Sequence, residues 1–112
     1  MKENKLTFTL ILAIALVFTG CASYELQKTG DITLTPREPD CEFTIYTQKP
    51  EKEYDEIGYV DLFSFGNGWT RDIQKAKRRA QDAVCQAGGN AIILSSNEIG
   101  EFASGTVLFI KE

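Results

Sequence analysis

One alanine-rich segment constrains the fold of this chain more than any other feature of its sequence. Within residues 71–87 the apolar side chains recur at helical spacing and form one stripe: Ile73, Ala76, Ala80, Ala83, Val84 and Ala87. This pattern predicts an amphipathic helix. Thr70 is placed to cap the helix, and Asp72 lies in its first turn, where a carboxylate complements the helix dipole. Gly88-Gly89 would end the helix, because glycine tolerates a left-handed backbone.

Strand patterns precede this helix. Residues 42–47 alternate apolar and polar side chains, as a half-buried strand does. Residues 57–65 predict a second strand in which Val60 and Leu62 face the core. The glycines within residues 66–68 then predict a turn before the helix.

Two further strands are predicted after the helix, at residues 90–96 and 106–112, joined by a loop around residues 100–105. The order of elements is therefore β-β-α-β-β. This order predicts an α+β fold, a small two-layer domain in which one helix packs on a mostly antiparallel sheet. Because the apolar stripe of the helix consists mainly of alanine, the helix should lie close against that sheet.

The start of the chain has the layout of an export signal. Two lysines within the first five residues precede an apolar run at residues 6–18. This run is shorter than the about 20 residues that a bilayer-spanning helix needs, so a secretory signal peptide is favoured. The segment Phe18-Thr19-Gly20-Cys21 resembles the bacterial lipobox, although Phe18 stands where that motif prefers leucine. The resemblance implies that the Cys21 sulfur is lipidated and that cleavage makes Cys21 the new N-terminus.

Two alternatives to lipidation stay open: an ordinary signal peptide that leaves Cys21 as a free thiol, or an uncut signal that anchors the chain. With lipidation, residues 1–20 form the signal peptide, residues 21–40 a tether and residues 41–112 the domain. We expect a short edge strand at residues 31–36 within the tether, which could reach about 65 Å when fully extended. By resemblance to lipoproteins of two-membrane bacteria, Ala22 after the cysteine favours the outer membrane.

The composition excludes several classes of function. The chain has no histidine, which excludes a Ser-His-Asp triad, a Cys-His pair and imidazole ligands for zinc. No arrangement in the sequence pairs a nucleophile with a base, so we predict that the protein is not an enzyme. Gly66 and Gly68 lack the third glycine of a dinucleotide fingerprint, and we predict no cofactor. The net charge of −4 argues against a nucleic-acid partner.

Several short motifs within residues 41–112 resemble a group of small bacterial lipoproteins. They are Cys41-Glu42-Phe43 at the start of a strand, Pro50, Tyr54, the run EIGYV, the alanine helix, the run CQAGGNAIIL and the closing run GTVLFIKE. Together these resemble outer-membrane lipoproteins with a domain like that of the Rcs stress sensor, and a related family described as heavy-metal-binding. The chain has two domain cysteines where the Rcs sensor has four, and it lacks that sensor's long proline-rich tether.

The two domain cysteines are predicted to pair. On a helical wheel Cys85 falls about 150° from the centre of the apolar stripe, so we expect it outside the core. An unpaired outward thiol is a liability in an oxidising compartment, and Cys41 is the best partner, with separate buried thiols as the alternative. A disulfide requires the segment before Cys41 to run along the helix. The metal alternative would join these two thiolates with carboxylates such as Glu42 and Asp82, but without histidine or a CxxC pair we predict no metal site.

Two classes of function remain. The first is a lipid-anchored, non-enzymatic module for binding, interaction or stress sensing in the envelope. The second is an anchored protein that binds a metal or a small ligand. Exposed aromatic side chains would favour the first class, and an enclosed pocket lined by polar groups would favour the second.

A basic stripe on the helix is the candidate docking surface. Arg71, Lys75 and Arg78 lie within about 60° of one another, opposite the apolar stripe. An acidic run at residues 51–56 carries the opposite charge elsewhere in the domain. The stripe could meet anionic lipid headgroups near the anchor or an acidic patch on an envelope protein, and the alternative is a merely solvated helix face.

Overall fold

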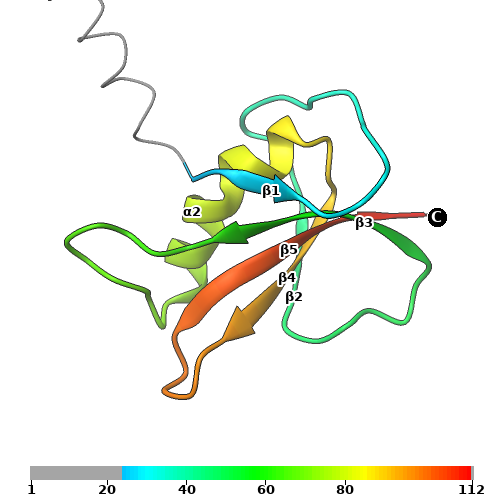
Figure 1. Cartoon of the computed structure of the whole chain (residues 1–112). Coiled ribbons are helices and arrows are strands. Elements are labelled where there is room, and N and C mark those ends of the chain that lie inside the picture. Colours follow the sequence, from blue (N-terminus) through cyan, green and yellow to red (C-terminus); the bar gives the residue numbers. More distant parts are fainter. Residues whose placement is uncertain (1–23, 112) are drawn as a thin grey trace, which may run out of the picture.

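The computed structural model describes residues 24–111, which form one sheet and one helix (Figure 1). The elements in chain order are β1 (Leu26–Lys28), β2 (Thr44–Tyr46), β3 (Tyr54–Asp61), α2 (Ile73–Gln86), β4 (Ala91–Ser96) and β5 (Phe102–Ile110). The strands lie in the order β1-β3-β5-β4-β2, and only the edge pair β2–β4 is parallel. This arrangement confirms the predicted α+β fold with a mostly antiparallel sheet, to which β1 adds a fifth strand.

The main core lies between α2 and one face of the sheet. Most of the predicted stripe packs there, with Ala76 and Ala80 fully buried and Ala83 nearly so. Ile73, which was predicted to belong to the stripe, is exposed in the first turn of α2. A smaller cluster lies on the other face of the sheet and consists of Ala91, Leu108 and Ile110. Because side chains alternate between the two faces of a strand, the central strand β5 contributes to both clusters.

The limits of α2 differ slightly from the expectation. The N-cap is Asp72, not Thr70, because the Asp72 Oδ1 atom accepts a hydrogen bond from the Gln74 backbone N–H at 2.9 Å. Thr70 instead supports the cap, since its hydroxyl oxygen accepts from the Asp72 N–H at 3.0 Å. At the other end Gly88 has φ +77°, the left-handed conformation expected of a helix-ending glycine.

Residues 24–40, which we expected to be a tether, pack on the domain instead. Residues 26–28 form β1, which pairs antiparallel with β3 in the register Leu26↔Val60, whereas residues 31–36 form no strand. Tyr24, Leu26 and Leu34 pack against the main core. The predominantly polar composition of the segment concealed these apolar contacts, which hold it to the sheet and to the end of α2.

Cys41 and Cys85 form the predicted disulfide, with the sulfur atoms 2.09 Å and the Cα atoms 5.8 Å apart. The expectation that Cys85 lies outside the core was wrong, because this residue is fully buried. The segment before Cys41 runs along the helix, as the disulfide requires. The Arg37 N–H donates to the Cys85 carbonyl oxygen at 2.8 Å, and Gln81 Nε2 donates to the Cys41 carbonyl oxygen at 2.9 Å. This segment covers a second flank of α2 and buries Cys85 there.

The predicted signal peptide, Cys21 and the last residue of the chain lie outside the described residues. Between Tyr24 and Lys111, α2 is neither long nor apolar enough to cross a membrane.

Candidate binding groove and aromatic loop

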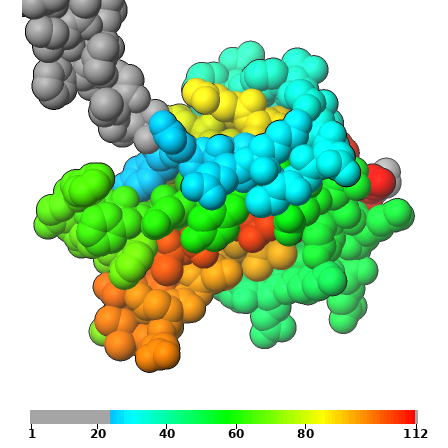
Figure 2. All heavy atoms as spheres, in the orientation of Figure 1, coloured from blue at the N-terminus to red at the C-terminus, as the bar shows by residue number. Residues whose placement is uncertain are grey.

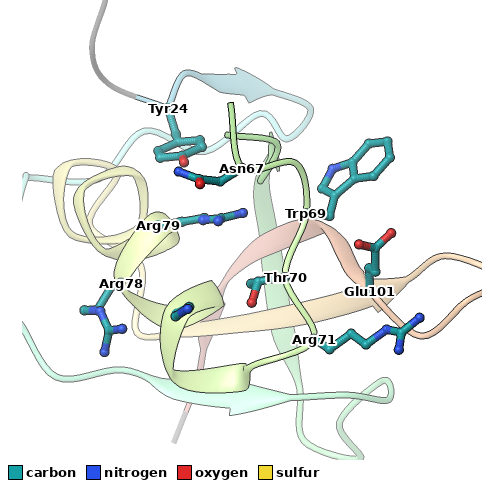
Figure 3. A pocket seen from close by; sticks show the side chains of 9 residues that line it. Tyr24, Asn67, Trp69, Thr70, Arg71, Arg78, Arg79 and Glu101 are labelled. Atoms are coloured by element: carbon teal, nitrogen blue, oxygen red, sulfur yellow. The ribbon is translucent and has the colours of Figure 1, made fainter. Parts of the chain in front are cut away.

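The three basic residues of the predicted docking surface line one open groove (Figure 3). Arg71, Lys75 and Arg78 are all exposed, and the groove between them and the neighbouring loop has a volume of about 760 Å³. Three further parts of the chain complete its walls. Tyr24 comes from the segment before β1, the residues Asn67, Trp69 and Thr70 come from the β3–α2 loop, and Glu101 comes from the β4–β5 turn.

The groove is positively charged on a chain whose net charge is negative. Arg79 adds a fourth cation, whereas Glu101 is the one carboxylate in the lining. The Glu101 carboxylate already accepts a hydrogen bond from Asn97 Nδ2 at 3.0 Å. Within residues 24–111 the side chains of Arg71, Lys75 and Arg78 have no hydrogen-bond or ion-pair partner. Three cations are therefore available to an anionic group that enters the groove.

Arg79 has a different role from its three neighbours. Its Nη1 atom donates to the carbonyl oxygens of Leu62 at 3.0 Å and Gly68 at 2.7 Å. These two carbonyls lie at the start and near the end of residues 62–70, which we call the aromatic loop. One guanidinium of α2 thus joins both arms of the loop and holds it against the helix.

Internal hydrogen bonds also define the shape of the aromatic loop. The backbones of Ser64 and Gly68 exchange hydrogen bonds of 3.0 Å and 2.7 Å. Gly66 and Gly68 have φ angles of +89° and +66°, which L residues rarely adopt, and the predicted turn is confirmed. The Phe102 N–H donates to the Thr70 carbonyl oxygen at 2.8 Å, which ties the end of the loop to β5.

The loop presents three aromatic side chains next to the groove. The Phe63 ring stands edge-to-face against Phe65 and Trp69, with ring centroids 5.7 Å and 5.2 Å away. Phe65 is 95% exposed and Phe63 40% exposed. Trp69 Nε1 donates to Asp61 Oδ1 at 3.2 Å. Figure 2 shows the light green loop projecting from the body of the protein, beside the blue start of the described chain.

Tyr24 connects the groove with the aromatic loop. It lines the groove, and it also lines a second hollow together with Phe63 and Phe65. The register Leu26↔Val60 explains this position, because it places the residues before β1 beside the end of β3, where the loop begins. In Figure 3 the Tyr24 ring lies close to Asn67 and Arg79 at one end of the groove.

Sequence reasoning did not find the aromatic residues or Tyr24. A signal for the loop was present, because three aromatic residues, Phe63, Phe65 and Trp69, surround the Gly-Asn-Gly turn. Phe63 also follows the buried Leu62 directly, and successive side chains of an extended segment point to opposite sides, so Phe63 points away from the core. No comparable signal identified Tyr24, whose position depends on the pairing of β1 with β3.

The described residues offer little to a metal ion. Among residues 24–111 no three Cys, Asp or Glu side chains gather in a way that could hold one. The sulfurs of Cys41 and Cys85, which the metal alternative requires as thiolates, are joined to each other. Glu42 and Asp82 are exposed.

No family model, curated protein or solved structure matches this chain. The function is therefore inferred from the groove and the aromatic loop themselves.

Proposed function

We propose that this protein is a lipid-anchored, non-enzymatic binding module of the bacterial envelope, and that its groove binds an anionic group of another envelope component. One observation carries the proposal: Arg71, Lys75 and Arg78 line a single groove and have no partner within the described part of the chain. Clustered cations on an acidic protein create a local attraction for anions that the net charge alone would not predict.

The polar groups of the groove support binding more than catalysis. The Thr70 hydroxyl accepts a hydrogen bond from the Asp72 N–H in the helix cap. The Glu101 carboxylate accepts a hydrogen bond from Asn97 Nδ2. Neither the hydroxyl nor the carboxylate is therefore paired with a general base that would activate a nucleophile. The chain also has no histidine to act as a proton carrier near neutral pH.

The surface around the groove supports an interaction module over a small-ligand pocket. Sites for small molecules usually enclose most of their ligand. Here the groove is open and three exposed or half-buried aromatic rings stand beside it, with Phe65 almost entirely in solvent. An extended surface, such as a membrane or another protein, fits this arrangement better than an enclosed molecule.

The anchor in this proposal comes from the sequence. A basic start, a short apolar run and the sequence Thr19-Gly20-Cys21 support lipidation at Cys21. The same features, with Ala22 after the cysteine, support an outer-membrane location with the domain in the periplasm or at the cell surface. A stress-sensing role would follow if the bound anion changed with the state of the envelope.

Cation-exchange chromatography tests the binding groove. The full chain carries a net charge of −4, and cleavage before Cys21 removes two lysines and one glutamate, so the lipidated protein is more acidic still. It should pass through a sulfonate resin at neutral pH unless its cations are clustered. We expect the lipidated protein, in non-ionic detergent at low salt, to be retained and to elute as salt is added. The triple variant Arg71→Glu, Lys75→Glu, Arg78→Glu should lose retention.

The control has the same net charge as this variant. In the triple variant Lys28→Glu, Lys49→Glu, Lys111→Glu the reversed charges lie outside the groove. Two of the changes remove surface contacts, the Lys111–Asp55 ion pair and the hydrogen bond from Lys28 Nζ to Thr33 Oγ1, and each such contact contributes little to stability. This protein should still be retained. Equal loss of retention in both triple variants would show that the groove has no special affinity for anions, and the proposed function would then fail.

A further inference from the structure

We propose that the partner of this surface is the bilayer that holds the anchor: the groove binds anionic lipid headgroups while Phe65 at the tip of the aromatic loop enters the membrane interface. This inference rests on the proposed function, because it requires lipidation at Cys21. It goes further by naming the lipid surface as the partner and by giving the domain an orientation.

The length of the chain between the anchor and the domain supports a membrane partner. Residues 24–40 pack on the domain, so the connection from Cys21 to Tyr24 is three residues long. At about 3.3–3.6 Å per residue, three residues span at most roughly 10 Å, even when fully extended. Tyr24 lines both the groove and the hollow beside Phe65. A lipidated Cys21 therefore keeps both features close to the headgroups.

The distribution of charge favours the same orientation. Arg71, Lys75 and Arg78 lie at the end of the molecule where the described chain begins, and they would face the phosphate groups of anionic lipids. The acidic residues Glu51 and Glu53 lie in the β2–β3 loop, at the opposite side of the molecule from the aromatic loop (Figure 1). The membrane would then attract the basic end and repel the acidic end.

The aromatic loop has the properties of an interfacial anchor. Aromatic side chains are enriched where a membrane meets water, because their rings are apolar and tryptophan and tyrosine also carry a polar group. Phe65 is 95% exposed, and the hydrogen-bonded turn and the contact with Phe63 hold it in place. Two carboxylates, Asp61 and Glu25, line the hollow beside Phe65. Asp61 already accepts hydrogen bonds from Trp69 Nε1 and the Phe63 N–H. Glu25 is exposed, and it would stay among the hydrated headgroups while the Phe65 ring enters the interface.

Fluorescence of Trp69 tests this inference, because it is the one tryptophan of the chain and contacts Phe63 in the loop. The lipidated protein is extracted from the envelope in detergent and reconstituted into vesicles whose lipids carry brominated acyl chains. In vesicles containing phosphatidylglycerol at low salt, we expect blue-shifted Trp69 emission that the bromines quench. Vesicles of phosphatidylcholine alone, or high salt, should reduce this quenching several-fold.

Two pairs of variants make the result specific. Phe65→Ser should reduce quenching several-fold, whereas Phe65→Leu, which keeps an apolar side chain, should retain most of it. The Arg71→Glu, Lys75→Glu, Arg78→Glu variant should lose quenching, and the Lys28→Glu, Lys49→Glu, Lys111→Glu variant should keep it. Because all these side chains are exposed, circular dichroism should show a folded domain in every case.

Several outcomes would overturn membrane docking. Trp69 emission that the bromines leave unquenched in anionic vesicles would do so, as would quenching that Phe65→Ser leaves unchanged. A Trp69 signal that changes only when an envelope protein is added would identify a protein partner instead. If the cation-exchange result holds while Trp69 stays unquenched, only the lipid surface is wrong. If the two triple variants behave alike on the resin, the proposed function itself fails.

Discussion

Arg79 Nη1 donates a 2.7 Å hydrogen bond to the Gly68 carbonyl oxygen, so a side chain of α2 fixes the arm of the aromatic loop that leads to Trp69. The same atom also donates to Leu62 in the other arm. The four cations of the groove thus divide into two kinds. Arg79 organises the loop, whereas Arg71, Lys75 and Arg78 remain available for an anion.

Replacing Arg79 should loosen the loop. Arg79→Lys keeps the charge, but the lysine side chain is shorter, so its ammonium should not reach the position from which Arg79 Nη1 donates to both carbonyls. We expect the free energy of unfolding to fall by roughly 1–2 kcal/mol, measured by urea denaturation, since the side chain is only partly buried. Residues 62–70 should also become sensitive to limited proteolysis. The control Arg78→Lys, at an exposed position of the same helix, should change stability by less than about 0.5 kcal/mol.

The disulfide should supply a large share of the stability of this small domain. Cys41 and Cys85 are separated by 44 positions, and closing a loop of this length stabilises by about 4 kcal/mol in the chain-entropy model. The double variant Cys41→Ala, Cys85→Ala should therefore unfold at a much lower urea concentration, followed by circular dichroism. Cys21→Ser, which removes a cysteine outside the described domain, should unfold like the unaltered chain. An unchanged midpoint in the double variant would contradict the structural importance of the disulfide.

Two glycines allow the packing of residues 34–35 on the helix end to be measured. Gly88 and Gly100 both have a left-handed backbone, with φ of +77° and +83°. A Cβ at Gly88 would lie 2.6 Å from Leu34 Cβ and from the Thr35 carbonyl oxygen, whereas a Cβ at Gly100 would meet nothing within 4 Å. Both alanine variants incur the conformational cost, about 1–2 kcal/mol.

Gly88→Ala should lose a further roughly 1–3 kcal/mol in urea denaturation, because the segment at Leu34 has to shift. Equal losses for the two variants would mean that this segment does not press against the end of α2.

The helix, the main strands and the disulfide could be predicted from the sequence because each depends on a local pattern or on few alternatives. The alanine stripe defined the buried face of α2, and the glycines within residues 66–68 defined a turn. The loop predicted around residues 100–105 was wrong for most of its length, because β5 begins at Phe102 and Gly105 is buried within that strand. The prediction that Cys85 lies outside the core failed because a helical wheel describes one face, whereas the segment before Cys41 covers a second flank. That contact joins positions far apart in the chain, and nothing local indicates it.

The edge strand β1 and the full groove were beyond sequence reasoning for the same reason. A three-residue strand has too few residues for a clear alternation, and its pairing with β3 determines its place. The grouping of Arg71, Lys75 and Arg78 could be predicted from the sequence, because their helical spacing places them on one side of α2. Tyr24, Trp69 and Glu101 reach the groove from three other segments, which only the fold brings together.

The proposed function depends most on the anchor at Cys21, and mass spectrometry of the protein extracted from the envelope tests this anchor most directly. We predict that the N-terminal peptide begins at Cys21 and has additional mass from acyl chains, part of which mild alkali removes because those chains are ester-linked. The Cys21→Ser variant should give a longer precursor without this mass. A wild-type peptide in which unmodified Cys21 still follows Gly20, or an N-terminus at another residue, would contradict the account.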